Sequence, residues 1–311
     1  MSFSKDTKTE LTAHLDSQRH CRLAELTAIC GICGEYAIRG DGKISFALQS
    51  ENILAIKKAA VLIRRLYHLA ADVCTVSSKD WKNSTYLLFV RDTDTVKKML
   101  YEMKLLKANG ALVDLEISHA DLIPDRECCR RAFLRGVFIC SGSISDPKSS
   151  YHFEIPCKSS ERAGDILKLL EAFEIDGKTT VRSGRHSVYV KEADRISEML
   201  GLLGATNAML EFENIRIYRG IAGDINRQVN CETANIKKTA KAGAAQVEQI
   251  NKIAEKIGLA SLSPELYEAA MLRLENPDTG LAELGAKLDP PVGKSGMYHR
   301  FAKIKKIAED L

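Results

Sequence analysis

The residues best suited to chemistry lie near the C-terminus, where basic and hydrogen-bonding side chains recur at helical spacing. From Lys294 to Lys306 the chain holds five Lys or Arg residues and no Asp or Glu. A helical face of this kind can neutralise DNA phosphates and enter the major groove. We therefore predict binding of double-stranded DNA by Lys294, Ser295, Tyr298, His299, Arg300, Lys303 and Lys306. An amphipathic helix whose basic face is merely solvated is the alternative that this pattern leaves open.

These side chains are predicted to divide the work of DNA binding between bases and phosphates. Ser295, Tyr298, His299 and Arg300 come first in the helix and would lie at its groove-facing end. The three lysines of the set, Lys294, Lys303 and Lys306, would mostly contact phosphate. No cofactor is needed for such binding, and we predict none.

The elements that must position this face form a predicted helix-turn-helix at about residues 279–310. Thr279 is expected to cap a short helix, and Pro290–Pro291 must interrupt it, because proline has no N–H to donate. Ser295 is expected to cap the final helix. The buried stripe of that helix is predicted to be Met297, Phe301, Ile304, Ala308 and Leu311.

Two helices are predicted before this motif, after a stretch rich in amide side chains. The stretch Asp224–Asn235 could read bases, but amides also cap helices and brace domain junctions. Arg227 is the residue there that we retain as a DNA-binding candidate. A long helix is then predicted over Ile236–Ile257, and a further helix is expected to begin at Ser263–Pro264.

The nine cysteines form no recognisable metal or redox motif in the sequence. An odd count and apolar surroundings favour reduced thiols in a cytoplasmic protein. Cys30-x-x-Cys33 and the adjacent pair Cys128–Cys129 are interpreted as packing residues. No apolar run reaches the roughly 20 residues of a membrane helix, and Met1–Lys8 does not resemble a secretory signal.

The first two thirds of the chain contain an internal repeat. Residues from Cys21 to Gly34 align with Cys129 to Gly142, and a later segment from Val90 aligns with one from Val190. Each copy predicts a helix ending at glycine, an alternating strand, a helix, two strands and a closing helix. The predicted strands are 43–48, 72–77 and 85–90, then 151–155, 177–182 and 187–190; the later helices are 52–69 and 160–173 and those that follow Asp92 and Glu192. This is an α+β duplication with pseudo-twofold symmetry.

The segment Leu134–Gly142 resembles the LAGLIDADG helix of homing endonucleases, and Leu26–Gly34 is its weaker counterpart. In that family two such helices pack across a pseudo-dyad, which would explain the small residues Ala28, Gly31 and Gly136. The family takes its metal-binding carboxylates from the residue before the final glycine. Here Cys33 and Ser141 occupy those positions and cannot replace hard anionic ligands, so we predict no metal site and no catalysis.

The whole chain resembles the WhiA family, through Cys129–Gly136, Ser143–Pro147, Asn226–Asn235 and Leu288–Arg300. The resemblance implies an αββαββα LAGLIDADG-like domain, residues 1–219 with halves 20–117 and 127–219, and a helical DNA-binding domain, residues 220–311. It also implies a nucleoid-associated transcriptional regulator in cell division, chromosome segregation or sporulation. Gly280 and Gly293 depart from the family and would weaken capping.

Three questions stay open after the resemblance. One is a protein partner, such as another transcription regulator or RNA polymerase. Another is an active metal-dependent endonuclease, with Glu35 and Asp146 as substitute ligands. The third is a first domain that docks proteins, with the helix-turn-helix as a weak DNA tether.

Overall fold

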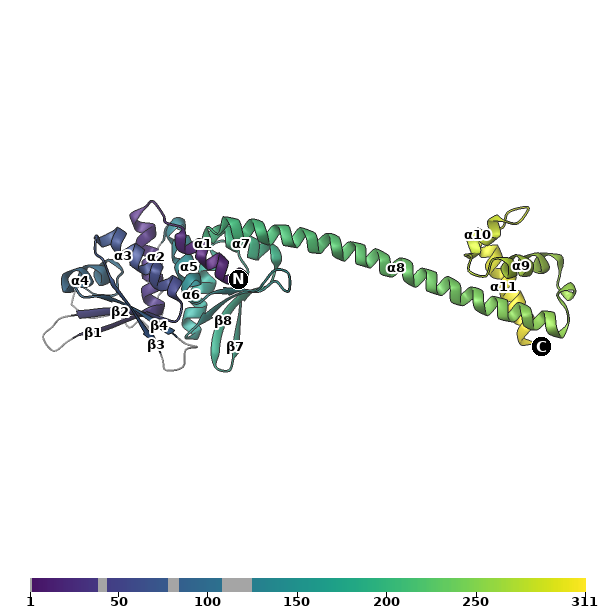
Figure 1. The fold of residues 1–311 in the computed structure, drawn as a ribbon, viewed down its shortest axis with the longest axis horizontal. Coiled ribbons are helices and arrows are strands. Elements are labelled where there is room, and N and C mark those ends of the chain that lie inside the picture. The colour runs from purple at the N-terminus through teal and green to yellow at the C-terminus, as the bar shows by residue number, and fades with distance from the viewer. Residues whose placement is uncertain (1, 39–43, 78–83, 108–124) are drawn as a thin grey trace. The chain divides into compact units, whose positions relative to one another are not determined.

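Two four-stranded antiparallel sheets with the same strand order dominate the first part of the chain (Figure 1). The computed structural model describes residues 2–38, 44–77, 84–107 and 125–311. The chain divides into two units, Met1–Arg219 and Gly220–Leu311. The predicted boundary between the two halves, the predicted strand residue Lys43 and the end of the first half at residue 117 lie outside the described residues.

The first half is built as α2-β1-β2-α3-β3-β4-α4, with the sheet order β1-β2-β4-β3. Its bounds are α2 Arg19–Cys33, β1 Gly34–Ile38, β2 Ile44–Ser50, α3 Ile53–Tyr67, β3 Asp72–Ser77, β4 Ser84–Val90 and α4 Thr93–Glu102. Side chains of Asn52 and Asp92 cap α3 and α4 by accepting hydrogen bonds from backbone N–H groups. The helices lie on one side of the sheet and enclose the apolar core with it (Figure 1).

The second half repeats this plan with the sheet order β5-β6-β8-β7. Its bounds are α5 Glu127–Cys140, β5 Ser143–Ile144, β6 Phe153–Cys157, α6 Ser160–Glu171, β7 Lys178–Arg182, β8 Arg185–Val190 and α7 Ala193–Leu203. The predicted duplicated α+β fold is therefore confirmed. The sequence pattern alone missed β1 and β5, which only the family resemblance implied, and it missed the N-terminal helix α1, Phe3–Ala13.

The two halves meet where α2 packs against α5. A Cβ atom on Gly136 would lie 2.6 Å from the backbone oxygen of Glu25 and 2.9 Å from Cβ of Ala28. Real side chains do not tolerate such distances, so glycine is required for this close approach of the backbones. This confirms the expected close packing at Gly136 and Ala28. The carbonyl oxygen of Gly31 accepts a hydrogen bond of 2.6 Å from Arg162 Nη2.

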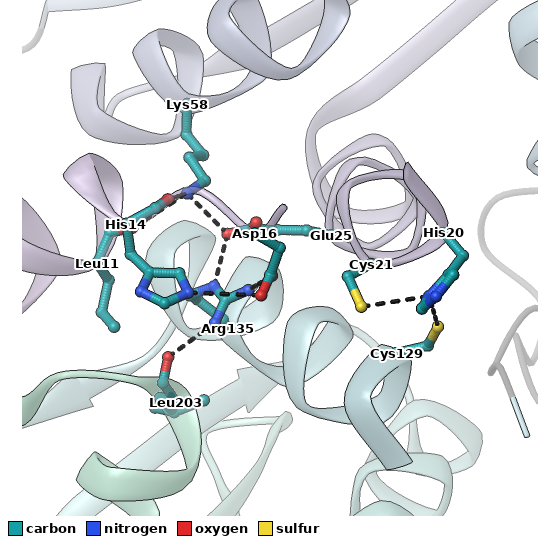
Figure 2. A network of polar contacts seen from close by, with 10 residues as sticks. All are labelled: Leu11, His14, Asp16, His20, Cys21, Glu25, Lys58, Cys129, Arg135 and Leu203. Carbon is teal, nitrogen blue, oxygen red and sulfur yellow. Dashed lines mark hydrogen bonds and ion pairs between the residues drawn. The ribbon is translucent and has the colours of Figure 1, made fainter. Parts of the chain in front are cut away.

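A buried ion network ties the same helices together (Figure 2). The carboxylate of Glu25 on α2 binds both Arg135 on α5 and Lys58 on α3. Lys58 Nζ also donates to the carbonyl oxygens of Leu11 and His14, which end α1 and begin the following loop. The network around Glu25 thus links α1, α2, α3 and α5.

The second unit is helical, and helix α8, which starts in the first unit and continues into the second, begins earlier than predicted. Helix α8 runs from Thr206 to Lys256, whereas the sequence predicted a start at Ile236. The stretch Asp224–Asn235 lies within this helix and is exposed throughout, so the prediction that its amides cap helices is wrong. The helices α9 Pro264–Glu275, α10 Leu281–Ala286 and α11 Lys294–Glu309 follow, after a short 3-10 turn at Leu259–Ser261.

Candidate nucleic-acid interface

Helix α11 has one apolar and one polar face. Met297, Phe301, Ile304 and Ala308 are buried against α8, α9 and α10 in the core of the second unit. Leu311 lies beyond the helix and is 40% exposed, so its predicted place in the buried stripe is wrong. Six of the seven predicted DNA-binding residues of the helix are exposed: Lys294, Ser295, Tyr298, His299, Lys303 and Lys306.

Arg300 is the seventh predicted residue and is only half-exposed. Its Nη1 lies 3.3 Å from the carbonyl oxygen of Glu265 in the first turn of α9, and donates to it. This contact holds Arg300 against a neighbouring helix and reduces its freedom to reach a base.

The start of α11 differs from the prediction. The capping position is Gly293, and Ser295 is the second residue of the helix. The first hydrogen bond of the helix runs from the Met297 N–H to the Gly293 carbonyl oxygen over 3.0 Å. The Met297 side chain is fully buried, which holds the helix in this register. Likewise, Gly280 and not Thr279 precedes α10. Neither glycine can supply a capping side chain, as their departure from the family suggested.

Close backbone contact fixes the turn between α10 and α11. The N–H of Val292 donates to the Gly285 carbonyl over 2.9 Å. A Cβ atom on Gly285 would lie 1.9 Å from the Val292 oxygen, so this approach requires glycine. The turn that presents α11 therefore depends on a residue of α10.

Arg273 organises the preceding turn, and the sequence interpretation missed it. It is buried on α9, and its Nη1 lies 2.7–3.1 Å from the carbonyl oxygens of Asn276, Pro277 and Thr279. Its guanidinium lies 5.3 Å from the ring centre of Phe301 on α11. Burial lowers the pKa of Arg273 from its usual range. Its helical spacing from Leu266, Ala269 and Ala270 was the available signal that it faces the core.

Arg227, the remaining DNA-binding candidate, is not on α11. It lies in the exposed part of α8, where its guanidinium forms an ion pair with Asp224 one turn earlier. The structure thus leaves Arg227 accessible but assigns it no place in the helix-turn-helix.

Cys33 and Ser141, at the positions where homing endonucleases carry metal ligands, make local contacts. Cys33 is buried at the end of α2, and a hydrogen bond from Cys140 lowers its pKa. The hydroxyl of Ser141 donates to the Val137 carbonyl over 3.3 Å at the end of α5. Of the alternative ligands, Glu35 is exposed on β1, and Asp146 accepts a hydrogen bond of 2.9 Å from the Lys148 N–H in a turn.

The two sheets differ in charge. Among the described residues, the strands of the first sheet contain Glu35 and Asp72 and no Lys or Arg. The strands of the second sheet contain one acidic residue, Glu154, and three basic residues: Lys178, Arg182 and Arg185. The strand residues of the first sheet therefore offer little attraction for phosphate. In the part of the chain that the structure describes, no helix combines the length and apolar character that a membrane span requires.

Comparisons with known proteins agree with this architecture. Three family models match in succession: the WhiA N-terminal LAGLIDADG-like domain over residues 19–106, the WhiA LAGLIDADG-like domain over 130–222 and the WhiA C-terminal HTH domain over 225–308. The crystal structure of full-length DUF199/WhiA from Thermatoga maritima is 25% identical, with a TM-score of 0.59 over 100% of this chain and 99% of that one.

Curated relatives match over the full length of the chain. The probable cell division protein WhiA of Lachnoclostridium phytofermentans is 40% identical, over 100% of this chain and 99% of that protein. The protein of the same name from Clostridium perfringens strain 13 is 39% identical, over 100% of this chain and 98% of its own length. On these similarities and the matching domain order, the chain belongs to the WhiA family.

Proposed function

We propose that this protein binds double-stranded DNA through α11 and acts as a transcriptional regulator or nucleoid-associated factor. The observation that carries the proposal is the exposed polar and basic face of α11, set opposite a fully buried stripe within a helix-turn-helix. Burial of Met297 and Ile304 prevents the helix from rotating, so the opposite face stays available to a partner. A regular helix of this width fits the major groove of B-DNA.

The side chains of this face divide into two chemical classes. Lys303 and Lys306 are exposed lysines in the second half of the helix, suited to phosphate contact. Ser295, Tyr298 and His299 lie in its first turns and offer hydrogen-bonding groups and aromatic surface to bases. Tyr298 is 63% exposed. Exposure of its large apolar ring to water costs free energy, and a bound partner that covers the ring would remove this cost.

The setting that we propose is the nucleoid in the cytoplasm, with a role in cell division, chromosome segregation or sporulation. Relatives of 39–40% identity carry the name probable cell division protein. Mapping of bound DNA across the genome tests this proposal: a limited set of promoters would support regulation, and uniform binding would support a general nucleoid role. Absence of enrichment at any DNA would contradict both.

We also propose that the first unit does not cleave DNA. The support is chemical: a thiol at Cys33 and a hydroxyl at Ser141 stand where the related endonucleases need carboxylates. The rival function is tested by incubating the full chain with a DNA library in Mg²⁺ or Mn²⁺. Cleavage that the substitutions Glu35→Gln or Asp146→Asn abolish would establish a nuclease and overturn this part of the proposal.

The first unit is proposed to dock proteins, with RNA polymerase or another regulator as the class of partner. The support comes from the first sheet, whose described strands carry no Lys or Arg and would be a poor surface for DNA; the second sheet, with Lys178, Arg182 and Arg185, does not add to it. A full chain carrying Lys303→Ala and Lys306→Ala tests this assignment. If it still bound DNA as tightly as the unaltered protein, the first unit would have to carry DNA binding.

A further inference from the structure

Four side chains with metal-binding atoms meet where α2 and α5 begin. His20 and Cys21 belong to α2, Cys128 and Cys129 belong to α5, and the nearest ligand atoms of all four lie within 4.8 Å of one another. The Nδ1 atom of His20 lies 3.1 Å from Sγ of Cys129 and 3.3 Å from Sγ of Cys21 (Figure 2). In the part of the chain that the structure describes, these four residues are the one group of His, Cys, Asp and Glu close enough to share an ion.

The internal repeat explains how this group arises. The same offset that aligns Cys21 with Cys129 aligns His20 with Cys128, so each half contributes two donors at equivalent positions. The close approach of α2 and α5 then brings the two pairs together across the pseudo-dyad. The interpretation of Cys128–Cys129 as packing residues is wrong for Cys128, which is exposed.

The donor set fits a tetrahedral Zn²⁺ site. Zinc–sulfur bonds of about 2.3 Å and zinc–nitrogen bonds of about 2.0 Å place tetrahedral ligands roughly 3.5–3.8 Å apart. The distances from His20 Nδ1 to the two sulfur atoms, 3.1 and 3.3 Å, are slightly shorter than these separations, and no pair of ligand atoms is more than 4.8 Å apart. Only small side-chain rotations are then needed. Thiolate and imidazole ligands favour Zn²⁺ over Mg²⁺ or Ca²⁺, which prefer oxygen.

We propose that His20, Cys21, Cys128 and Cys129 bind one Zn²⁺ ion that cross-links the two halves of the first unit. All four ligands come from the protein, so the site is structural, with no open position for a substrate. Cys21 and Cys129 are buried, whereas Cys128 is exposed and His20 is half-buried, which gives the ion a route in from one side. Since the unfolded chain cannot hold the four donors together, binding stabilises the folded state.

The ionisation of the thiols follows from the same geometry. Burial, together with the neighbouring thiol of Cys128, raises the pKa of Cys21 to about 12 and also raises the pKa of Cys129. Asp16 acts in the same direction on Cys21, whereas Arg126 opposes the shift at Cys129. Without an ion, the thiols of Cys21 and Cys129 are therefore protonated.

The test uses the full chain, freed of metal with a chelator under reducing conditions. Titration with Co²⁺ should give one equivalent per chain, with thiolate charge-transfer bands and the visible bands of tetrahedral Co²⁺, and Zn²⁺ should displace it. Zn²⁺ should also raise the melting temperature of the first unit. The doubly substituted chain His20→Ala and Cys128→Ser should lose both effects while staying folded, because it alters the less buried ligand of each half.

Cys74→Ser is the matched control, because it removes another exposed thiol away from this group. It should bind Co²⁺ like the unaltered chain. The proposal is overturned if the reduced chain binds no stoichiometric metal, if His20→Ala with Cys128→Ser binds as well as the control, or if mass analysis after alkylation finds these thiols in a disulfide instead. None of these outcomes depends on DNA binding by α11.

Discussion

Arg135 on α5 donates from Nε to Oε1 of Glu25 on α2 over 3.0 Å, and both side chains are almost fully buried. Lys58 Nζ lies 3.1 Å from the same oxygen. Burial lowers the pKa of Lys58, while Glu25 acts against that shift. Arg135 also donates to Asp16 and, over 3.1 Å, to the carbonyl of Leu203. The two halves of the first unit are thus joined by a charge network whose centre, Glu25 and Arg135, is buried.

Replacement of Arg135 by Met should strongly destabilise the first unit. It leaves Glu25 buried with only Lys58 for compensation, and breaking a buried pair in this way costs about 3–5 kcal/mol. Urea unfolding followed by circular dichroism measures the change. Arg131→Met is the matched control on the same helix, because its ion pair with Glu127 is exposed and should contribute under about 1 kcal/mol. Equal effects of the two substitutions would contradict the role of the network.

Replacement of Gly136 by Ala should also destabilise the first unit. Its new Cβ would lie 2.6 Å from the Glu25 carbonyl oxygen, so α2 and α5 would have to separate. Overpacking of this kind costs about 1–3 kcal/mol. Gly164→Ala in α6 is the control, since nothing lies within 4 Å of its Cβ position. That change should raise the melting temperature through helix propensity, and the two substitutions should therefore shift it in opposite directions.

Replacement of Lys303 and Lys306 by Ala should weaken binding to every DNA sequence alike. If both lysines contact phosphate, the slope of log affinity against log salt should fall by up to about 1.8. Fluorescence anisotropy at several salt concentrations measures this slope. Lys305→Ala is the control, since its ammonium lies 3.6 Å from the Glu309 carboxylate on the same helix. An unchanged slope in the double variant would remove α11 from the DNA interface.

Replacement of Arg273 by Met should unfold the turn that precedes α10. Three carbonyl oxygens lose their donor, and the unit should lose about 2–4 kcal/mol of stability because buried acceptors are left unpaired. DNA affinity should fall together with the helical signal of the second unit. Arg227→Met is the control for stability alone, because that side chain and its ion pair with Asp224 are exposed. A stable, DNA-binding Arg273→Met variant would show that the turn does not need this residue.

Replacement of Gly293 by Ser should stabilise the second unit. The glycine has φ −66° and ψ 163°, which suits any residue, and nothing lies within 4 Å of its Cβ position. A serine hydroxyl can accept from a free N–H of the first turn, for a gain of a few tenths to about 1 kcal/mol. Gly293→Ala separates capping from the loss of chain entropy. Melting curves should rank Ser above Ala, and the reverse order would exclude a capping effect.

Most of the helices and strands, and much of the chemistry, could be predicted from the sequence alone. Alternating and helical spacing located α2 and α5, six of the eight strands and the helix-turn-helix, because these patterns reflect which side chains are buried. It also determined that Cys33 and Ser141 are not metal-binding carboxylates. It could not place β1 or β5, which are five and two residues long and carry too little periodicity. The sequence pattern assigned the caps to Thr279 and Ser295, because hydroxyl side chains are preferred at N-caps. In the structure α11 starts so that Met297 is buried, and this places Gly293 at the capping position.

Which distant residues act together depends on how the elements pack in the folded chain. Glu25 and Arg135, and likewise Cys21 and Cys129, are separated by more than a hundred positions in the chain and show no local signature. They meet because Gly136 lets α2 and α5 approach closely, so equivalent positions of the two repeats face each other. Arg273 is decided in the same way, because its three acceptors are carbonyl groups of a folded turn. Local spacing predicts which face of an element is buried, but packing between elements decides what that face contacts.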